Sequence, residues 1–192
     1  VHGIVGRANI HCSDVVVVSG PGPIGLLTAQ LAKAGGATVV ILGVGSDETR
    51  LSVAKALGID LALNVEEQDP VPILMERTGG LGADVVCECA GVAPSVTQCL
   101  KLARRGAQFI QLGTSRKEMT VDFAQISYKE LNVIGSFNYE RVDWEIALNL
   151  MAQGRVQVKP LITHKFPLPD WQAGFALSDD KRGIKILLYP DD

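Results

Sequence analysis

The sequence has no long hydrophobic run, no block of basic residues and no initiating methionine. Glycine, proline or a charged residue breaks each apolar stretch before the roughly 20 residues of a membrane-spanning helix, and the first residues do not resemble a secretory leader. The 18 basic and 21 acidic residues, net charge −3, are dispersed. These absences argue against a membrane partner and against nucleic acid. Because the chain starts Val1-His2-Gly3, we expect it to be a piece of a longer protein.

Cysteine and histidine are scarce. The four cysteines are Cys12, Cys87, Cys89 and Cys99, and the three histidines are His2, His11 and His164. Cys87 and Cys89 fall in a predicted buried strand, so we expect free thiols and a cytoplasmic, reducing location. A metal site at Cys87-Glu88-Cys89 is the alternative, but alternate strand positions point to opposite faces and the histidines lie at no ligand spacing. We predict neither a metal site nor a catalytic residue here.

Apolar residues are plentiful, at 47%, and form short runs that alternate with amphipathic stretches. Val15–Val18 is a β-branched run typical of a strand covered on both faces. Apolar positions at helical spacing then predict a helix over 23–34. The pattern continues with strands expected at 39–42, 61–65, 83–88, 108–112 and 131–134, and helices at 49–57, 70–78, 94–103 and 124–128. This α/β alternation predicts a doubly wound, six-stranded parallel sheet, the Rossmann fold.

The last forty residues follow a different pattern. A helix is expected over 142–151, and from Gly154 onward short β segments surround one short helix at 171–177. The β segments, at 156–163, 164–168 and 184–189, are expected to be isolated strands that belong to another sheet. We therefore predict a short C-terminal β-containing segment of a largely absent domain.

The turn after the first strand has the pattern Gly-x-Gly-x-x-Gly at Gly20, Gly22 and Gly25. The first glycine suits a tight turn, the second lets the backbone approach a pyrophosphate, and the third allows close packing of helix on strand. The helix start then offers N–H groups and a positive dipole end to phosphates. The motif predicts dinucleotide binding. A glycine turn without ligand, or a fold holding S-adenosylmethionine, is the alternative.

The end of the second strand lacks the acid that usually binds the adenosine ribose. Gly43 or Gly45 occupies that position, depending on a one-residue ambiguity in register. Without the carboxylate a 2′-phosphate is not repelled, and Ser46 and Arg50 could contact it. This favours NADP over NAD. In the alternative, Arg50 is a solvated helix residue, and Asp47 or Glu48 serves the ribose.

Several stretches resemble the medium-chain dehydrogenase family of the zinc type. They are Gly-Pro-Ile-Gly at 22–25, Leu-Ser-Val-Ala-Lys-Ala-Leu-Gly at 51–58, Gly-Ala-Asp-Val-Val at 82–86 and Glu-Cys-Ala-Gly at 88–91. The segments 135–139 and 158–168 resemble the sorbitol (polyol) dehydrogenase branch, with threonine dehydrogenase a close relative. The similarity runs over nearly the whole chain.

The resemblance implies a division into parts. Residues 1–13 would be the remnant of an inter-domain connection, 14–154 the dinucleotide-binding domain, and 155–192 a segment returning to the catalytic domain. It also implies that the catalytic zinc is held by ligands in the absent domain. Family members form homo-oligomers, so a dimer or tetramer through the sheet edge is expected, with Val156–Thr163 one candidate edge.

The resemblance also assigns contacts with the cofactor. Gly22, Pro23 and Ile24 would line the pyrophosphate, and Arg50 the adenosine side. Leu112, Gly113 and Thr114 would hold the nicotinamide carboxamide through backbone groups. Phe137 and Tyr139 would approach the nicotinamide and the substrate; without the family, they would be rim-packing residues. Sorbitol dehydrogenases commonly have an arginine between these aromatics, where this chain has Asn138, so a sugar alcohol does not follow directly.

The implied activity of the complete protein is hydride transfer between a secondary alcohol or polyol and a nicotinamide cofactor, assisted by zinc. The chain by itself is expected to bind dinucleotide without turnover. The alternative from another class is a stand-alone dinucleotide-binding or sensing module without catalysis.

Overall fold

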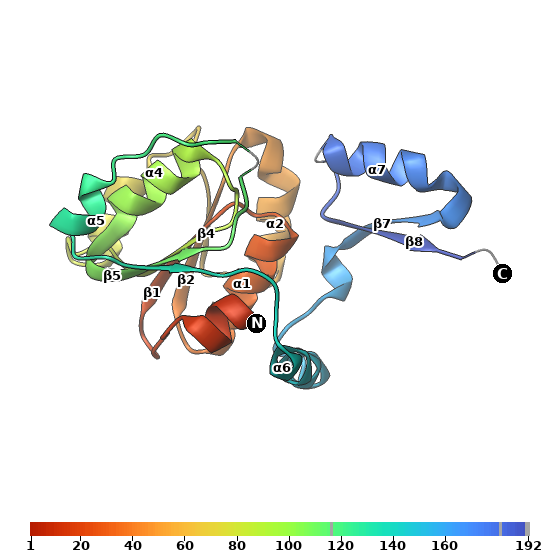
Figure 1. Cartoon of the computed structure of the whole chain (residues 1–192), viewed down its shortest axis with the longest axis horizontal. Coiled ribbons are helices and arrows are strands. Elements are labelled where there is room, and N and C mark those ends of the chain that lie inside the picture. The colour runs from red at the N-terminus through yellow and green to blue at the C-terminus, as the bar shows by residue number, and fades with distance from the viewer. Residues whose placement is uncertain (116, 181, 191–192) are drawn as a thin grey trace. The chain divides into compact units, whose positions relative to one another are not determined.

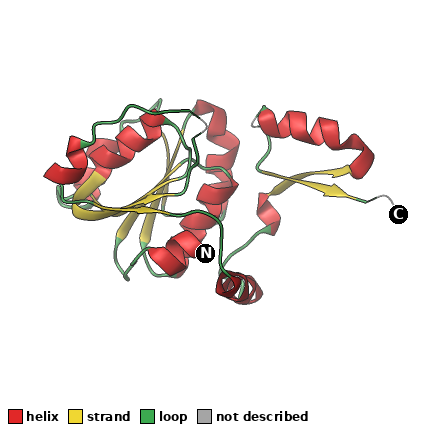
Figure 2. Cartoon of the chain, in the orientation of Figure 1, coloured by secondary structure: helices red, strands yellow, loops and turns green. Residues whose placement is uncertain are grey.

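The computed structural model describes residues 1–115, 117–180 and 182–190, and the chain divides into two compact units, Val1–Val156 and Gln157–Asp192. The first unit contains the larger sheet and its helices, and the second contains two strands and one α-helix (Figures 1 and 2).

The first unit is built on a parallel sheet of six strands in the order β3-β2-β1-β4-β5-β6. The strands are β1 (Val15–Ser19), β2 (Thr38–Gly43), β3 (Leu61–Asn64), β4 (Ala83–Glu88), β5 (Ala103–Gln111) and β6 (Asn132–Gly135). The order reverses between β1 and β4, as in a doubly wound fold. This confirms the predicted sheet.

Helices α1 to α5 connect successive strands of this sheet, and α6 follows its last strand. They are α1 (Pro23–Ala34), α2 (Glu48–Ala56), α3 (Pro70–Arg77), α4 (Ala93–Leu102), α5 (Ala124–Tyr128) and α6 (Arg141–Ala152), with a π-helix, η1 (His2–Arg7), at the start and a 3-10 turn, η2 (Gly45–Asp47), before α2. Proline occupies the first turn of α1, α3 and α4, where its missing N–H leaves no hydrogen bond unmade.

The centre of the sheet is covered on both faces (Figure 2). Val16, Val17 and Val18 of β1 are at most 1% exposed. Because neighbouring strand residues point to opposite faces, both sides of β1 must be packed. On one face Val17 belongs to a core cluster with Leu74 of α3 and Leu100 of α4. On the other face Val18 lies beneath α1, close to Gly25. The β-branched run thus forms the expected doubly covered strand.

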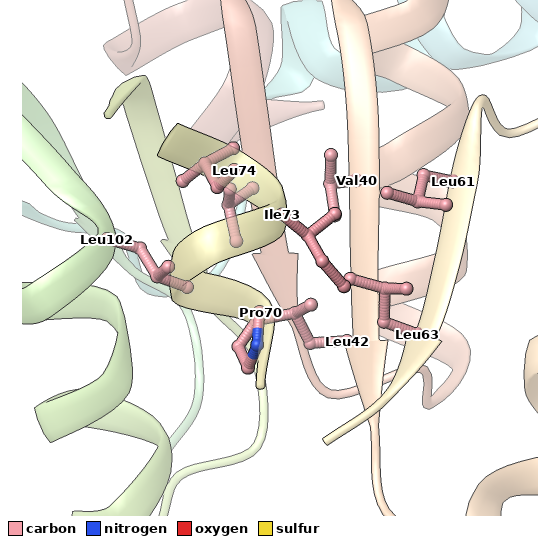
Figure 3. Close-up of a pocket in the computed structure, with 9 residues that line it drawn as sticks. Val40, Leu42, Leu61, Leu63, Pro70, Ile73, Leu74 and Leu102 are labelled. Carbon is pink, nitrogen blue, oxygen red and sulfur yellow. The ribbon is translucent and has the colours of Figure 1, made fainter. Parts of the chain in front are cut away.

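A small hollow remains beneath α3. It lies between Pro70, Ile73 and Leu74 of the helix and apolar side chains of β1, β2 and β3, with Leu102 at one side (Figure 3). Every lining side chain is apolar and the hollow does not admit a water molecule. It is a packing gap, which a ligand does not enter.

The fifth strand is longer than the predicted 108–112. It begins directly after α4 ends at Leu102, with Ala103 paired to Ala83. The register then shifts before Val85 pairs with Gln108, and Gly106 in the intervening segment has φ +71°. The irregularity interrupts the apolar pattern, and for this reason the first part of the strand could not be identified from the sequence.

The second unit is a strand–helix–strand motif. Strands β7 (Ile162–Pro167) and β8 (Lys185–Tyr189) pair in parallel and α7 (Trp171–Asp179) connects them. Gly174 lets α7 pack closely on the strands, since an added Cβ would lie 3.3–3.5 Å from Leu188, Phe166 and Ile186.

Two expectations for this region were wrong. Val156–Thr163 is not a strand: it contains a 3-10 turn, η3 (Lys159–Leu161), with Pro160 inside it, and β7 starts only at Ile162. It therefore offers no sheet edge, and the edge strands of the larger sheet are β3 and β6. The β segments are also not isolated, because β7 and β8 pair with each other. Across residues 1–115, 117–180 and 182–190, no helix is both long and apolar enough to span a bilayer.

Candidate functional site

The glycine-rich turn joins β1 to α1 and is shaped by close backbone contacts. Gly20 has φ +99°, and a Cβ there would lie 2.9 Å from the Ala90 backbone nitrogen. A Cβ on Gly25 would lie 1.9 Å from the Gly20 carbonyl oxygen, so the helix approaches the turn more closely than any side chain allows. At Gly22, in contrast, a Cβ would meet no atom within 4 Å. The turn therefore presents open backbone at Gly22.

Helix α1 begins at this turn. Gly22 is its N-cap and Pro23 its first residue, so the helix starts without a side-chain cap. The N–H groups of the first turn face away from the helix body, and twelve residues of aligned peptide dipoles give this end a partial positive charge. The arrangement suits a phosphate. Ile24, also in the first turn, is exposed.

The tip of β2 lies beside the glycine turn. Gly43, the last residue of β2, is buried, and a Cβ there would lie 2.8 Å from Pro21 and 3.0 Å from the Asp47 Cβ. The Gly45 amide donates to the Glu66 carboxylate at 2.8 Å, and the Val44 amide donates to Asp47 at 3.2 Å. The carboxylates near β2 therefore come from η2 and from the turn after β3.

Arg50 is engaged by a protein acid. Its guanidinium lies 2.9 Å from an oxygen of the Asp47 carboxylate, and both side chains are only 13% exposed. It is therefore not the solvated helix residue of the alternative interpretation. Ser46, the other candidate ligand of a 2′-phosphate, is exposed on η2.

A buried carboxylate links the ends of the central strands. Glu88, the last residue of β4, is fully buried and accepts hydrogen bonds from the Ala90 and Gly91 amides at 2.9 Å, from Ser95 Oγ at 2.6 Å and from Gln111 Nε2 at 2.5 Å. These donors satisfy an acid that would otherwise be costly to bury. Sequence reasoning considered Glu88 only within a possible metal site and a family motif and missed this structural role, although an acid ending an otherwise apolar strand was the available signal.

The loops after β4 and β5 contact each other around this carboxylate. A Cβ on Gly113 would lie 2.4 Å from the Gly91 amide nitrogen and 2.5 Å from Glu88 Oε2. A Cβ on Gly91, where φ is +70°, would lie 2.7 Å from the Thr114 carbonyl oxygen. Gln111 Nε2 also donates to the Gly113 carbonyl at 2.7 Å. Gly113 and Thr114 therefore belong to a tightly fixed piece of backbone.

An open cavity of about 220 Å³ lies beside these loops. Among the predicted site residues it brings together Ile24, Leu112 and Phe137. The rest of its wall comes from α1, from the residues after β6 and from the start of the chain, namely Leu27, Thr28, Leu31, Ser136, Asn138 and Val1–Ile4. Tyr139 is not part of this wall: its ring packs edge-on against Trp144, with centroids 5.3 Å apart.

The cysteines hold no metal-ligand arrangement. Cys87 and Cys99 are buried, and burial raises the pKa of both thiols well above the usual value. Burial also raises the pKa of Cys89 to about 12, against a lowering contribution from a hydrogen bond with Thr28. Within the described parts of the chain, no three His, Cys, Asp or Glu side chains are grouped as metal ligands. The raised pKa values keep the thiols of Cys87, Cys89 and Cys99 protonated.

The fold and the glycine turn together define a Rossmann domain of the dinucleotide-binding type. The chain belongs to the zinc-binding dehydrogenase family, whose sequence pattern matches residues 23–153. It is 41% identical over its whole length to a sorbitol dehydrogenase of Halalkalibacterium halodurans, and 32% identical over 99% of its length to an L-threonine 3-dehydrogenase of Bacillus velezensis. The resemblance seen in the sequence is thereby confirmed.

Solved structures agree with this family. A protein of Sinorhizobium meliloti classed with the zinc-binding dehydrogenases, in complex with NADP, is similar over 98% of this chain and 56% of its own, with a TM-score of 0.87 and 30% identity. The chain spans about half the length of the curated relatives it matches, 56% of the Halalkalibacterium enzyme and 55% of the Bacillus enzyme.

Proposed function

We propose that this chain is the NAD(P)-binding part of a zinc-dependent dehydrogenase that acts on an alcohol or polyol. The observation that carries the proposal is that the glycine turn, the Gly91 and Gly113 loops and the open cavity all lie at the carboxyl ends of the parallel strands. In doubly wound sheets, dinucleotides bind at the carboxyl ends of the strands, where the strand order reverses.

The residues present fit such a cofactor. The empty space at Gly22 and the N–H groups of α1 would receive the pyrophosphate, next to Pro23, Ile24 and the closely packed Gly20 and Gly25. We propose that Leu112, Gly113 and Thr114 hold the nicotinamide carboxamide through backbone groups, and that Phe137 forms an apolar wall beside the ring. Tyr139 is proposed at the substrate side, beyond Phe137. Gly43 and Ser46 would lie at the adenosine end.

In the full-length protein the proposed reaction is reversible hydride transfer between a secondary alcohol and the nicotinamide. Bound zinc would polarise the alcohol oxygen, and the nicotinamide would supply the hydride chemistry. This chain would bind and orient the dinucleotide, and Ile24, Leu112 and Phe137 would keep water from the ring. The zinc ligands are proposed to lie outside this chain.

We also propose a cytoplasmic location and a homo-oligomer. The subunits would associate through an edge strand of the larger sheet, either β3 or β6.

A stand-alone sensing module is the other candidate. A protein that works without a partner domain is expected to have polar residues on its exposed surface. Helix α6 instead exposes Val142, Trp144 and Leu148 by 51–60% of their surface. Large exposed apolar side chains on one helix are typical of an interface. This favours the interpretation that the chain is part of a larger enzyme over the interpretation that it is a stand-alone module.

Binding can be tested directly on the 192-residue chain. Titrating it into NADH should enhance and blue-shift the nicotinamide fluorescence and reach saturation, because the ring enters an apolar cavity. ADP-ribose should displace the NADH, and S-adenosylmethionine should not. If neither NADH nor NADPH binds, or if S-adenosylmethionine binds in their place, the proposed function is wrong.

A further inference from the structure

The side chains after β2 indicate which dinucleotide the site selects, an inference that rests on the proposed function. We propose that the chain prefers NAD to NADP, and that Glu66, from the turn after β3, replaces the ribose-binding acid that is missing at the tip of β2. The absence of that acid from the sequence predicts the opposite preference.

Apart from the exposed Ser46 hydroxyl, the donors near the tip of β2 are engaged by protein carboxylates. The Gly45 amide donates to Glu66 and the Val44 amide to Asp47. The guanidinium of Arg50 is paired with Asp47 at 2.9 Å in a largely buried contact. A 2′-phosphate would have to displace a carboxylate from the Gly45 or Val44 amide in order to accept from it, and it would share the Arg50 guanidinium with Asp47.

The two glycines at the tip of β2 lie close to Pro21 and to Glu66. A Cβ on Gly45 would lie 2.8 Å from Glu66 Oε2, and a Cβ on Gly43 would lie 2.8 Å from Pro21. An aspartate or glutamate at Gly43 would therefore collide with Pro21, and one at Gly45 would displace the Glu66 carboxylate. The acid is thus supplied by the turn after β3, next to the tip of β2.

Glu66 also has the means to bind a ribose. One carboxylate oxygen, Oε2, is held by the Gly45 amide, which fixes the group at the tip of β2. Within the described part of the chain, no hydrogen bond to Oε1 is recorded, and the residue is exposed. A carboxylate held in this way accepts a hydrogen bond from a ribose hydroxyl, which a 2′-phosphate cannot donate.

Charge acts in the same direction. The segments 43–50 and 64–67, which form this corner, contain the four acids Asp47, Glu48, Glu66 and Glu67 and one base, Arg50. Like charges brought together at a binding surface oppose association. A 2′-phosphate would enter this corner with further negative charge, whereas the 2′-hydroxyl of NAD brings none.

The test compares NADH with NADPH binding to the 192-residue chain and to two variants, Glu66→Gln and Glu67→Gln. The parent should bind NADH at least about tenfold more tightly than NADPH. Glu66→Gln should lower the affinity for NADH and raise the affinity for NADPH. The two affinities should then differ by no more than about threefold. Glu67→Gln removes the same charge one residue away, from a carboxylate that accepts from Asn64 at 2.9 Å, and should reduce the ratio much less than Glu66→Gln does.

The outcomes separate this proposal from the proposed function. The NADP complex of the Sinorhizobium relative makes NADPH the necessary rival ligand. Tighter binding of NADPH than NADH by the parent, or an equal change of the ratio in both variants, would overturn the role of Glu66 while leaving dinucleotide binding intact. Absence of binding by both nucleotides would contradict the proposed function itself. Equal melting temperatures of the three proteins establish that all are folded.

Discussion

At the scale of single residues, two glycines of the same turn are in opposite surroundings. A Cβ on Gly22 would project into open space, and this residue has the ordinary backbone angles φ −69° and ψ −177°. A Cβ on Gly25 would lie 1.9 Å from the Gly20 carbonyl oxygen. A substitution at Gly22 should therefore leave folding intact and impair binding, whereas a substitution at Gly25 should impair folding.

We accordingly expect Gly22→Ala to keep its free energy of unfolding within about 1 kcal/mol of the parent, since alanine fits the backbone there. It should lose most NADH affinity, because the methyl group takes the space proposed for the pyrophosphate. Gly25→Ala should lower the free energy of unfolding by at least about 2 kcal/mol through steric overlap. Denaturant unfolding and NADH titration measure the two effects. Unchanged NADH affinity in Gly22→Ala would remove this turn from the cofactor site.

Sequence patterns predicted the residues that act through backbone shape better than those that act through side-chain pairing. The spacing of Gly20, Gly22 and Gly25 fixes their place in a strand–turn–helix unit, because it depends on neighbours in the chain. The partners of Arg50 and Gly45 do not follow from spacing in this way. Asp47 engages Arg50 through the geometry of a 3-10 turn, and Glu66 reaches Gly45 from another strand. Contacts of that kind become visible only when strands are placed side by side.

At the scale of elements, the C-terminus of α4 is capped by a lysine from a distant part of the chain. Lys129 Nζ donates to the carbonyl oxygens of Leu100, Lys101 and Ala103 at 2.7–2.9 Å. These carbonyls lie at the helix end, where no later N–H pairs with them and the dipole favours a cation. Partial burial lowers the pKa of Lys129.

We expect Lys129→Met to lower the free energy of unfolding by about 1–2 kcal/mol, because three carbonyls lose a charged donor while the apolar stem of the side chain is retained. Lys101→Met, at an exposed lysine on the last turn of α4, should change it by less than about 0.5 kcal/mol. Urea unfolding at neutral pH measures both. Equal stability of the two variants would show that the cap contributes nothing.

The elements themselves were predicted unevenly along the chain. In the first unit, β-branched runs of strand length alternate with amphipathic runs of helix length. This pattern indicates strands and helices in turn, and all six strands were predicted. Near Val156–Thr163 an apolar run with Pro160 inside it resembled a strand, but proline cannot donate to a ladder and the segment forms a 3-10 turn instead. Pairing of β7 with β8 was missed because the second unit is one short strand–helix–strand motif with little repetition to support it.

At the scale of the whole molecule, the chain comprises a complete sheet unit and a smaller unit, and it matches about half the length of its curated relatives. The side chains proposed to meet a nicotinamide lie within the first unit. Metal ligands, in contrast, are not grouped anywhere in the described residues. Binding and chemistry are therefore expected to be separable.

We expect the 192-residue chain to bind NADH without oxidising alcohols, even with added zinc, because the residues that the structure describes contain no group of side chains that would hold the metal beside the nicotinamide. Formation of reduced cofactor from sorbitol or 2,3-butanediol, followed by absorbance, should equal the rate in protein-free blanks. NADH binding by the same preparation serves as the control for folding. Alcohol-dependent reduction above the blank would contradict the proposed division of the enzyme.

The buried carboxylate of Glu88 links the two loops that are proposed to lie beside the cofactor. It holds the Ala90 and Gly91 amides directly and reaches the Gly113 carbonyl through Gln111. The loop after β4 cannot move away without leaving a buried acid short of donors, which is costly. The loop after β5 cannot move away without breaking the bonds of Gly113 to the Gln111 amide and to the Glu88 backbone carbonyl. The two loops therefore form one preorganised wall, and a nucleotide that binds there loses little affinity to the ordering of flexible backbone.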